Sequence, residues 1–179
     1  MSINPIYSLL AEHSTGIWGG DLTYARYEHL TAQGEIEKYL YFIKEGAVRA
    51  YFSDGEIENT IRLGYQGNVI NALPSFMNGK PSTIAMETLK KTTVQRAKKE
   101  DVMQVIESSS EIRLTWTHML EQLFLSQFER EIDLLTPSPE ERYKRVLARS
   151  PELFQEIPAK YIADYLRMSP ETLSRMKKS

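Results

Sequence analysis

The residues best suited to chemistry gather near the end of the chain, on one short segment. An arginine can read guanine edges, a glutamate can accept from the cytosine amino group, and hydroxyl groups and lysines can contact bases or phosphates. A segment with all of these is typical of a reader of the DNA major groove, although charge alone favours the solvated face of a basic helix. The residues concerned are Ser169, Glu171, Thr172, Ser174, Arg175, Lys177 and Lys178.

Two short helices must hold these side chains. The sequence from Pro158 to Lys178 predicts a helix, a break at Arg167 and Met168, and a second helix. Ser169 can cap the second helix, and Pro170 suits its first position because no amide hydrogen is needed there. The pair fits a helix-turn-helix. Its inner faces would come from Ile162, Ala163, Leu166, Leu173 and Met176.

A proline-rich break precedes this pair. Thr136-Pro137-Ser138-Pro139 ends a long helical pattern, and Ser138 can cap the next helix. We therefore divide the chain into a front domain at residues 1–110, a long helix at residues 111–136, and a C-terminal domain at residues 137–179 that contains the helix pair.

The charge of the chain is unevenly distributed, although the total is only −2. Residues 138–179 hold nine Lys and Arg against six Asp and Glu, whereas the preceding residues hold 13 against 18. The chain is thus acidic in front and basic behind. The lack of cysteine in the sequence excludes disulfides, thiolate zinc sites and cysteine-ligated iron–sulfur clusters.

Residues 36–96 show strand-type runs broken by turn residues. The clearest local signal is Asp54-Gly55, which predicts a hairpin between Val48–Phe52 and Ile57–Leu63. Closely spaced short strands without intervening helices predict a small barrel or jelly roll rather than a parallel sheet.

A long amphipathic helix follows, because apolar residues recur at three- and four-residue steps without an internal glycine or proline. The stripe is wide and aromatic, so we expect part of it to pack on the same helix of a second subunit. The alternative is packing on its own barrel alone. The predicted dimer residues are Trp116, Leu120, Leu123, Phe124, Phe128 and Ile132.

The sequence Ser-Pro-Glu-Thr-Leu-Ser-Arg at 169–175, preceded by Ile-Ala-x-x-Leu, resembles the recognition unit of the Crp/Fnr family of bacterial transcription regulators. This resemblance implies that Glu171 and Arg175 read bases and that Ser169 and Thr172 contact the DNA backbone. It extends forward to about residue 30, because KYLYFIKEGAVRAYF and GNVINAL resemble the cyclic-nucleotide-binding barrel of the family.

Three departures from the family pattern affect DNA binding. Pro170 replaces a contacting arginine of many members, so the target sequence should differ. Arg167 stands where the family has a glycine with positive φ, which costs a non-glycine residue on the order of 1 kcal/mol. The sequence given stops just after the second helix, so we expect the terminal β-wing to be missing.

Family members that bind cyclic nucleotide hold its phosphate with a Gly-Glu-Leu turn and an Arg-Ala or Arg-Ser pair. The glutamate and the arginine are both absent here, so we expect no tight binding of cyclic AMP. A different small anion could bind instead, and an empty or collapsed pocket is the alternative. The candidate effector pocket comprises Asn71, Ala72, Leu73, Lys80, Ser82 and Thr83.

Together these features predict an α+β protein: an N-terminal β-barrel or jelly roll of the cyclic-nucleotide-binding type, a long dimerisation helix, and a winged-helix-like helix-turn-helix without its wing. We expect a cytoplasmic homodimer that regulates transcription, with double-stranded DNA as partner and RNA polymerase as a further candidate. No cofactor is expected. No membrane contact is expected either, since no apolar run approaches the roughly 18 residues of a membrane span.

Two other classes of function stay open at this point. One is a ligand-binding or protein-interaction module whose tail no longer reads DNA. The other is a metal enzyme of the related cupin type, which would need clustered histidines. His13, His29 and His118 are too scattered in the sequence to suggest such a cluster.

Overall fold

The computed structural model describes residues 4–177, which form eight strands and eight helices. The strands are β1 (Leu22–Tyr24), β2 (His29–Thr31), β3 (Tyr39–Glu45), β4 (Ala47–Ser53), β5 (Glu58–Tyr65), β6 (Val69–Ile70), β7 (Ala85–Thr88) and β8 (Thr92–Lys98). The helices are α1 (Pro5–His13), α2 (Leu73–Asn78), α3 (Lys99–Ser108), α4 (Ser110–Leu135), α5 (Pro139–Arg149), α6 (Leu153–Glu156), α7 (Ala159–Tyr165) and α8 (Pro170–Met176).

The strands build two four-stranded antiparallel sheets, in the orders β1-β8-β3-β6 and β2-β7-β4-β5. Apolar side chains between the sheets form one core, which includes Tyr41, Ile43, Val48 and Met86. The expected β-rich front with antiparallel rather than parallel strands is therefore confirmed. We call this unit the barrel.

The predicted hairpin joins β4 to β5. Ser53 pairs with Glu58, and Gly55 has a φ of 100°, a conformation that favours glycine. The Asp54 side chain accepts hydrogen bonds from the backbone amides of Glu56 and Ile57, at 3.0 and 2.9 Å. The hairpin forms as predicted, and its loop spans residues 54–57.

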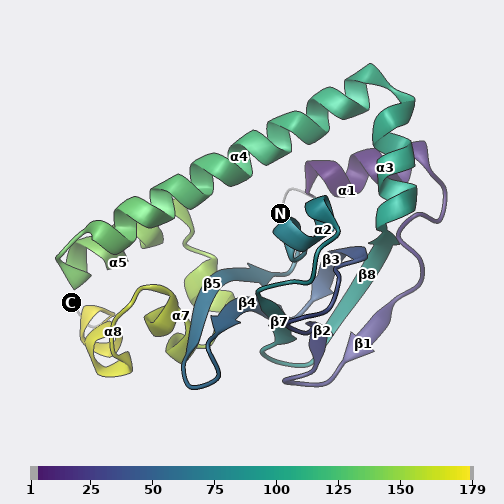
Figure 1. Cartoon of the computed structure of the whole chain (residues 1–179). Helices are drawn as coiled ribbons and strands as arrows, with labels where there is room; N and C mark the ends of the chain where they lie inside the picture. The colour runs from purple at the N-terminus through teal and green to yellow at the C-terminus, as the bar shows by residue number, and fades with distance from the viewer. Residues whose placement is uncertain (1–3, 178–179) are drawn as a thin grey trace.

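The helical pattern after the barrel is divided between two helices. Ser109 separates α3 from α4 and caps α4 by accepting from the backbone amide of Glu111. Figure 1 shows α4 running from α3 across the barrel to the C-terminal helices. The first half of α4 packs with α1 and α3 around Leu10, Ile112 and Trp116.

The C-terminal helices share a core with the barrel. Leu153, Ile162, Leu166 and Leu173 cluster with Ala47, Leu63 and Leu89 of the barrel. Asp133 of α4 is buried and accepts from Arg145 and Arg149 of α5, which fixes the bend between these two helices. The C-terminal helices therefore have a fixed position against both α4 and the barrel.

The long helix α4 is apolar on two opposite faces, which corrects part of the predicted dimer stripe. Trp116 is buried in the core of its own subunit, and Leu120 packs against that core. Leu123 is half-buried on the same inner face and lines a cavity beside the barrel. The outer face instead exposes Leu114, Leu125, Phe128, Ile132 and Leu135. Phe124 lies between the two faces, because it is 67% exposed and also lines that cavity.

Candidate nucleic-acid interface and barrel cavity

The outer face of α8 carries polar and charged side chains into solvent. Glu171, Ser174 and Arg175 are exposed, whereas Thr172 is half-buried. An Nη atom of Arg175 lies 3.4 Å from the Thr172 hydroxyl. The backbone amide of Glu171 and the Ser169 hydroxyl hold the pKa of the Glu171 carboxyl below its ordinary value, so this carboxylate is charged at neutral pH.

Ser169 and Pro170 begin α8 as the sequence predicted. The Ser169 hydroxyl accepts from the backbone amide of Thr172 at 3.1 Å, and Pro170 occupies the first turn. On the opposite side, Leu173 is 1% exposed and packs in the core shared with α7. Lys177 is exposed just after α8, and Lys178 lies outside the described residues.

The turn before α8 has the geometry expected from the sequence. Arg167 has a φ of 53°, the left-handed conformation that glycine adopts most readily. The backbone amide of Met168 donates to the carbonyl of Ala163 at 3.0 Å, which closes the end of α7. Arg142 of α5 donates to the carbonyl of Arg167 at 3.3 Å, so a hydrogen bond from α5 holds the turn in place.

Polar contacts join the end of α7 to β5, the edge strand of the barrel. The backbone amide of Thr60 in β5 donates to the Asp164 carboxylate at 2.7 Å. Arg130 of α4 donates to the Thr60 carbonyl at 2.8 Å and to the Tyr165 carbonyl at 3.4 Å. One arginine thus holds the long helix, the barrel edge and α7 together.

A cavity of about 500 Å³ lies between the barrel and α4. Aliphatic side chains of β5, α2 and α4 form much of its wall, with Phe124 at the helix side. Its polar side chains are Arg62, Asn71, Thr83 and Gln127.

The structure brings only some of the predicted pocket residues to this cavity. Asn71, Leu73 and Thr83 line it. Ala72 is fully buried, and Lys80 is exposed outside the cavity lining. The Ser82 hydroxyl donates to the carbonyl of Ile84 and accepts from the Ile84 amide, so it closes a local turn.

A buried carboxylate from the segment before β3 lies against the start of α2. Glu37 is 1% exposed, and its oxygens accept from the Thr31 hydroxyl at 2.7 Å, the Tyr39 amide at 2.9 Å and the Ala72 amide at 3.3 Å. Burial raises the pKa of Glu37, although these hydrogen bonds act in the opposite direction. The Ala72 amide therefore already has a hydrogen-bond partner within the protein, Glu37.

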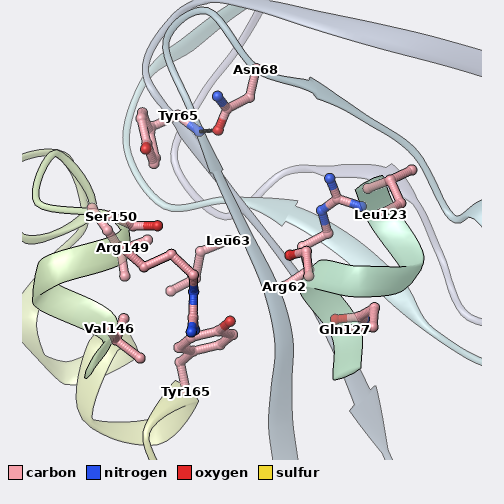
Figure 2. A pocket seen from close by; sticks show the side chains of 12 residues that line it. Arg62, Leu63, Tyr65, Asn68, Leu123, Gln127, Val146, Arg149, Ser150 and Tyr165 are labelled. Carbon is pink, nitrogen blue, oxygen red and sulfur yellow. Dashed lines mark hydrogen bonds between the residues drawn. The ribbon is translucent and has the colours of Figure 1, made fainter. Parts of the chain in front are cut away.

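Arg62 is the cavity residue that sequence reasoning missed. It lies in β5 and also lines a second cavity of about 160 Å³ between the barrel and α5. Figure 2 shows its side chain extending toward Leu123 of α4, with Arg149 and Tyr165 on the other side of β5. A lone arginine between Ile61 and Leu63 is the only local signal of this position.

The front of the chain matches a known protein family in sequence. Residues 21–109 match the family model described as the cyclic nucleotide-binding domain. The barrel is therefore similar in sequence to cyclic nucleotide-binding domains. No curated protein matches the chain in sequence.

Solved structures resemble the chain beyond this cyclic nucleotide-binding domain. FixK2 from Bradyrhizobium japonicum aligns with a TM-score of 0.75 at 19% identity, over 89% of this chain and 82% of that one. The Thermus thermophilus catabolite activator protein aligns with a TM-score of 0.56 at 20% identity, over 99% and 83%. The c-di-GMP responsive global regulator CLP of Xanthomonas campestris aligns with a TM-score of 0.64 at 14% identity, over 97% and 89%. The structural neighbours are regulators of the Crp/Fnr type, and the likeness at these identities is one of fold.

Two features are absent from residues 4–177. Within that range, no group of three or more His, Cys, Asp or Glu side chains is placed to hold a metal ion. In the same range, no helix combines the length and apolarity that crossing a membrane would require.

Proposed function

We propose that the chain is a sequence-specific DNA-binding transcription regulator of the Crp/Fnr type, working in the cytoplasm with double-stranded DNA as its partner. The observation that carries this proposal is the α7–α8 pair. Its second helix is capped by Ser169, anchored by Leu173, and exposes Glu171, Ser174 and Arg175 on one side. These three side chains match the donors and acceptors of base edges in the major groove.

The positioning of α7 and α8 supports a helix-turn-helix. The left-handed Arg167 and the contact from Arg142 fix the angle between the two helices. A recognition helix needs such support because base contacts depend on the placement of each side chain. Arg175 and Glu171 are the proposed base readers, whereas Ser169, Thr172, Ser174 and the lysines would contact bases or the DNA backbone.

The outer face of α4 supports a homodimer. Phe124, Phe128 and Leu135 are 67%, 56% and 74% exposed in the single subunit, and apolar patches of this kind commonly mark interfaces. Pairing two copies of α4 would cover this face and present two α8 helices to DNA. An effector or a partner, RNA polymerase among the candidates, would act by shifting that helix pair.

The barrel is proposed as an effector domain that does not hold cyclic AMP tightly. A cyclic phosphate needs donors and positive charge at the start of α2 and in the following loop. There the Ala72 amide is already bound to Glu37, and Ser82 is engaged with Ile84. Glu37 therefore competes with a phosphate for the Ala72 amide.

Selection of duplexes from a random DNA pool tests the proposed function. The wild type should enrich a defined sequence, and its affinity should fall steeply with salt because phosphate contacts release counterions. Arg175→Ala should lose the enrichment, since one bidentate arginine–guanine pair contributes about 1–3 kcal/mol of discrimination.

Lys91→Ala is the matched control, because Lys91 is exposed in the turn before β8 and its loss removes the same charge. This variant should select the same sequence as the wild type. Equal enrichment by Arg175→Ala would contradict the assignment of α8. No enrichment by the folded wild type would favour an interaction module instead.

A further inference from the structure

The cavity between the barrel and α4 contains donors and positive charge without a balancing acid. No aspartate or glutamate is among the described residues that line it. Its walls are otherwise largely apolar, with Ile61, Leu73, Pro74, Leu120 and Phe124 among the lining residues. A ligand that fits must therefore combine an apolar body with an acceptor or a negative charge.

Arg62 supplies the positive charge. Among residues 4–177 no hydrogen bond or ion pair is formed by its guanidinium, and burial lowers its pKa. Part of its surface stays accessible because the residue lies between two cavities. An arginine surrounded by protein and lacking a counter-charge is costly unless an anion joins it.

Two other arginines of the chain have polar partners within the protein. Arg49, also in the barrel, is paired with Glu87 at 2.7 Å and with Glu58. Arg130 is bonded to two backbone carbonyls. Arg62 has neither kind of partner, which sets it apart from both.

Asn71 provides a second, independent observation. Its Nδ2 atom is buried and has no hydrogen-bond partner in the structure. Buried polar groups are normally paired, and an orphaned donor costs about 1–3 kcal/mol. Asn71 lines the same cavity as Arg62, so rotation of its amide toward this space would let one ligand accept from both.

We propose that this cavity binds a small organic acid, whose carboxylate pairs with Arg62 and Asn71 and whose apolar body packs against α2 and α4. The cavity volume of about 500 Å³ lies within the usual range of about 300–1,000 Å³ for small-molecule sites. A nucleotide fits less well, because its base and ribose need more polar partners than these walls supply.

The ligand would contact the same helix that carries the exposed apolar face. Leu120, Leu123 and Phe124 of α4 all line the cavity. An acid bound there can change the position of α4, and this regulatory role rests on the function proposed above. Binding of the acid itself does not depend on DNA.

Calorimetry with three probes tests the ligand class: octanoate below its micelle concentration, 1-octanol, and inorganic phosphate. Octanoate should bind the wild type about tenfold or more tightly than 1-octanol, because a charge-assisted pair is lost in the alcohol. Phosphate should not compete with octanoate, since it has no apolar body. Equal binding of octanoate and 1-octanol, effective competition by phosphate, or no octanoate binding would overturn the proposal.

Arg62→Gln and Arg113→Gln are the matched variants. Arg113 is exposed near the start of α4, outside the cavity lining. Arg62→Gln should weaken octanoate binding about tenfold or more, while Arg113→Gln leaves it unchanged. An unchanged affinity in folded Arg62→Gln would contradict the proposal. If that variant fails to fold, the comparison of octanoate with 1-octanol on the wild type still decides.

The two proposals can fail separately. Octanoate binding without any sequence preference for DNA would overturn the regulator and keep the acid site. Selection of a defined DNA sequence without octanoate binding would overturn the acid site and keep the regulator.

Discussion

Arg167 shows how a single residue adapts a turn that glycine would occupy more easily. A non-glycine residue in this conformation costs on the order of 1 kcal/mol. Its side chain bonds to Asn59 of the barrel and lies near Asp164, contacts that glycine cannot make. The backbone strain at Arg167 is thus accompanied by a side-chain link between the C-terminal helices and the barrel.

Glu37 is the residue whose burial should make stability depend on pH. Burial raises its folded-state pKa above the ordinary value of 4.5, so the folded state holds its proton more tightly than the unfolded state. As pH rises from about 4.5 toward neutrality, the unfolded state gains more from ionisation, and the stability due to this group falls.

We therefore expect the wild type to gain stability relative to Glu37→Gln when pH is lowered from 7 to about 4.5. Urea unfolding of both proteins at several pH values measures this difference. Glu35→Gln is the control, because Glu35 is exposed two residues away. A wild-type advantage that shrinks as pH falls would refute this account of Glu37.

At the scale of elements, α4 is the helix with two functions. Its inner face packs on the barrel around Ile112 and Trp116, and its outer face is exposed around Phe128 and Ile132. Periodicity in the sequence indicated a helix with a wide apolar stripe, but it could not show which part of the stripe would meet the barrel. That assignment depends on tertiary packing.

Phe128→Glu should convert the proposed dimer into a monomer. Burying each phenylalanine contributes about 1.5–3 kcal/mol, and a two-fold dimer loses two of them. The dissociation constant should therefore rise about 100-fold or more, as measured by sedimentation at micromolar concentration.

Gln122→Glu provides the control, since Gln122 is exposed on α4 but lines a groove beside α1 rather than the outer apolar face. It should sediment as the wild type does. A wild-type chain that is monomeric at these concentrations would contradict the pairing of α4.

Features specified within a few residues were predictable from the sequence. The Asp54-Gly55 hairpin and the Ser169 cap follow from turn and capping preferences that involve only neighbouring residues. The cavity was not predictable in the same way. Arg62 and Asn71 line the same cavity only because β5, α2 and α4 converge, while the Ser82 hydroxyl bonds within a local turn.

At the scale of the whole molecule, the C-terminal helices rest on the barrel rather than standing apart from it. They share a core with Leu63 and Leu89, and Thr60 is bonded to Asp164 and Arg130. A change in the barrel cavity can therefore reach α7 through β5 as well as through α4. Both routes lead to the proposed recognition helix.

The separation of half-sites in DNA selected by the wild type tests the central claim most directly. Two α8 helices related by a two-fold axis should select a palindrome, with half-site centres one helical turn apart, about 34 Å. A footprint with that spacing, lost in Arg175→Ala, is the result we predict. A single unrepeated site, or no sequence preference, would contradict a dimeric DNA-binding regulator.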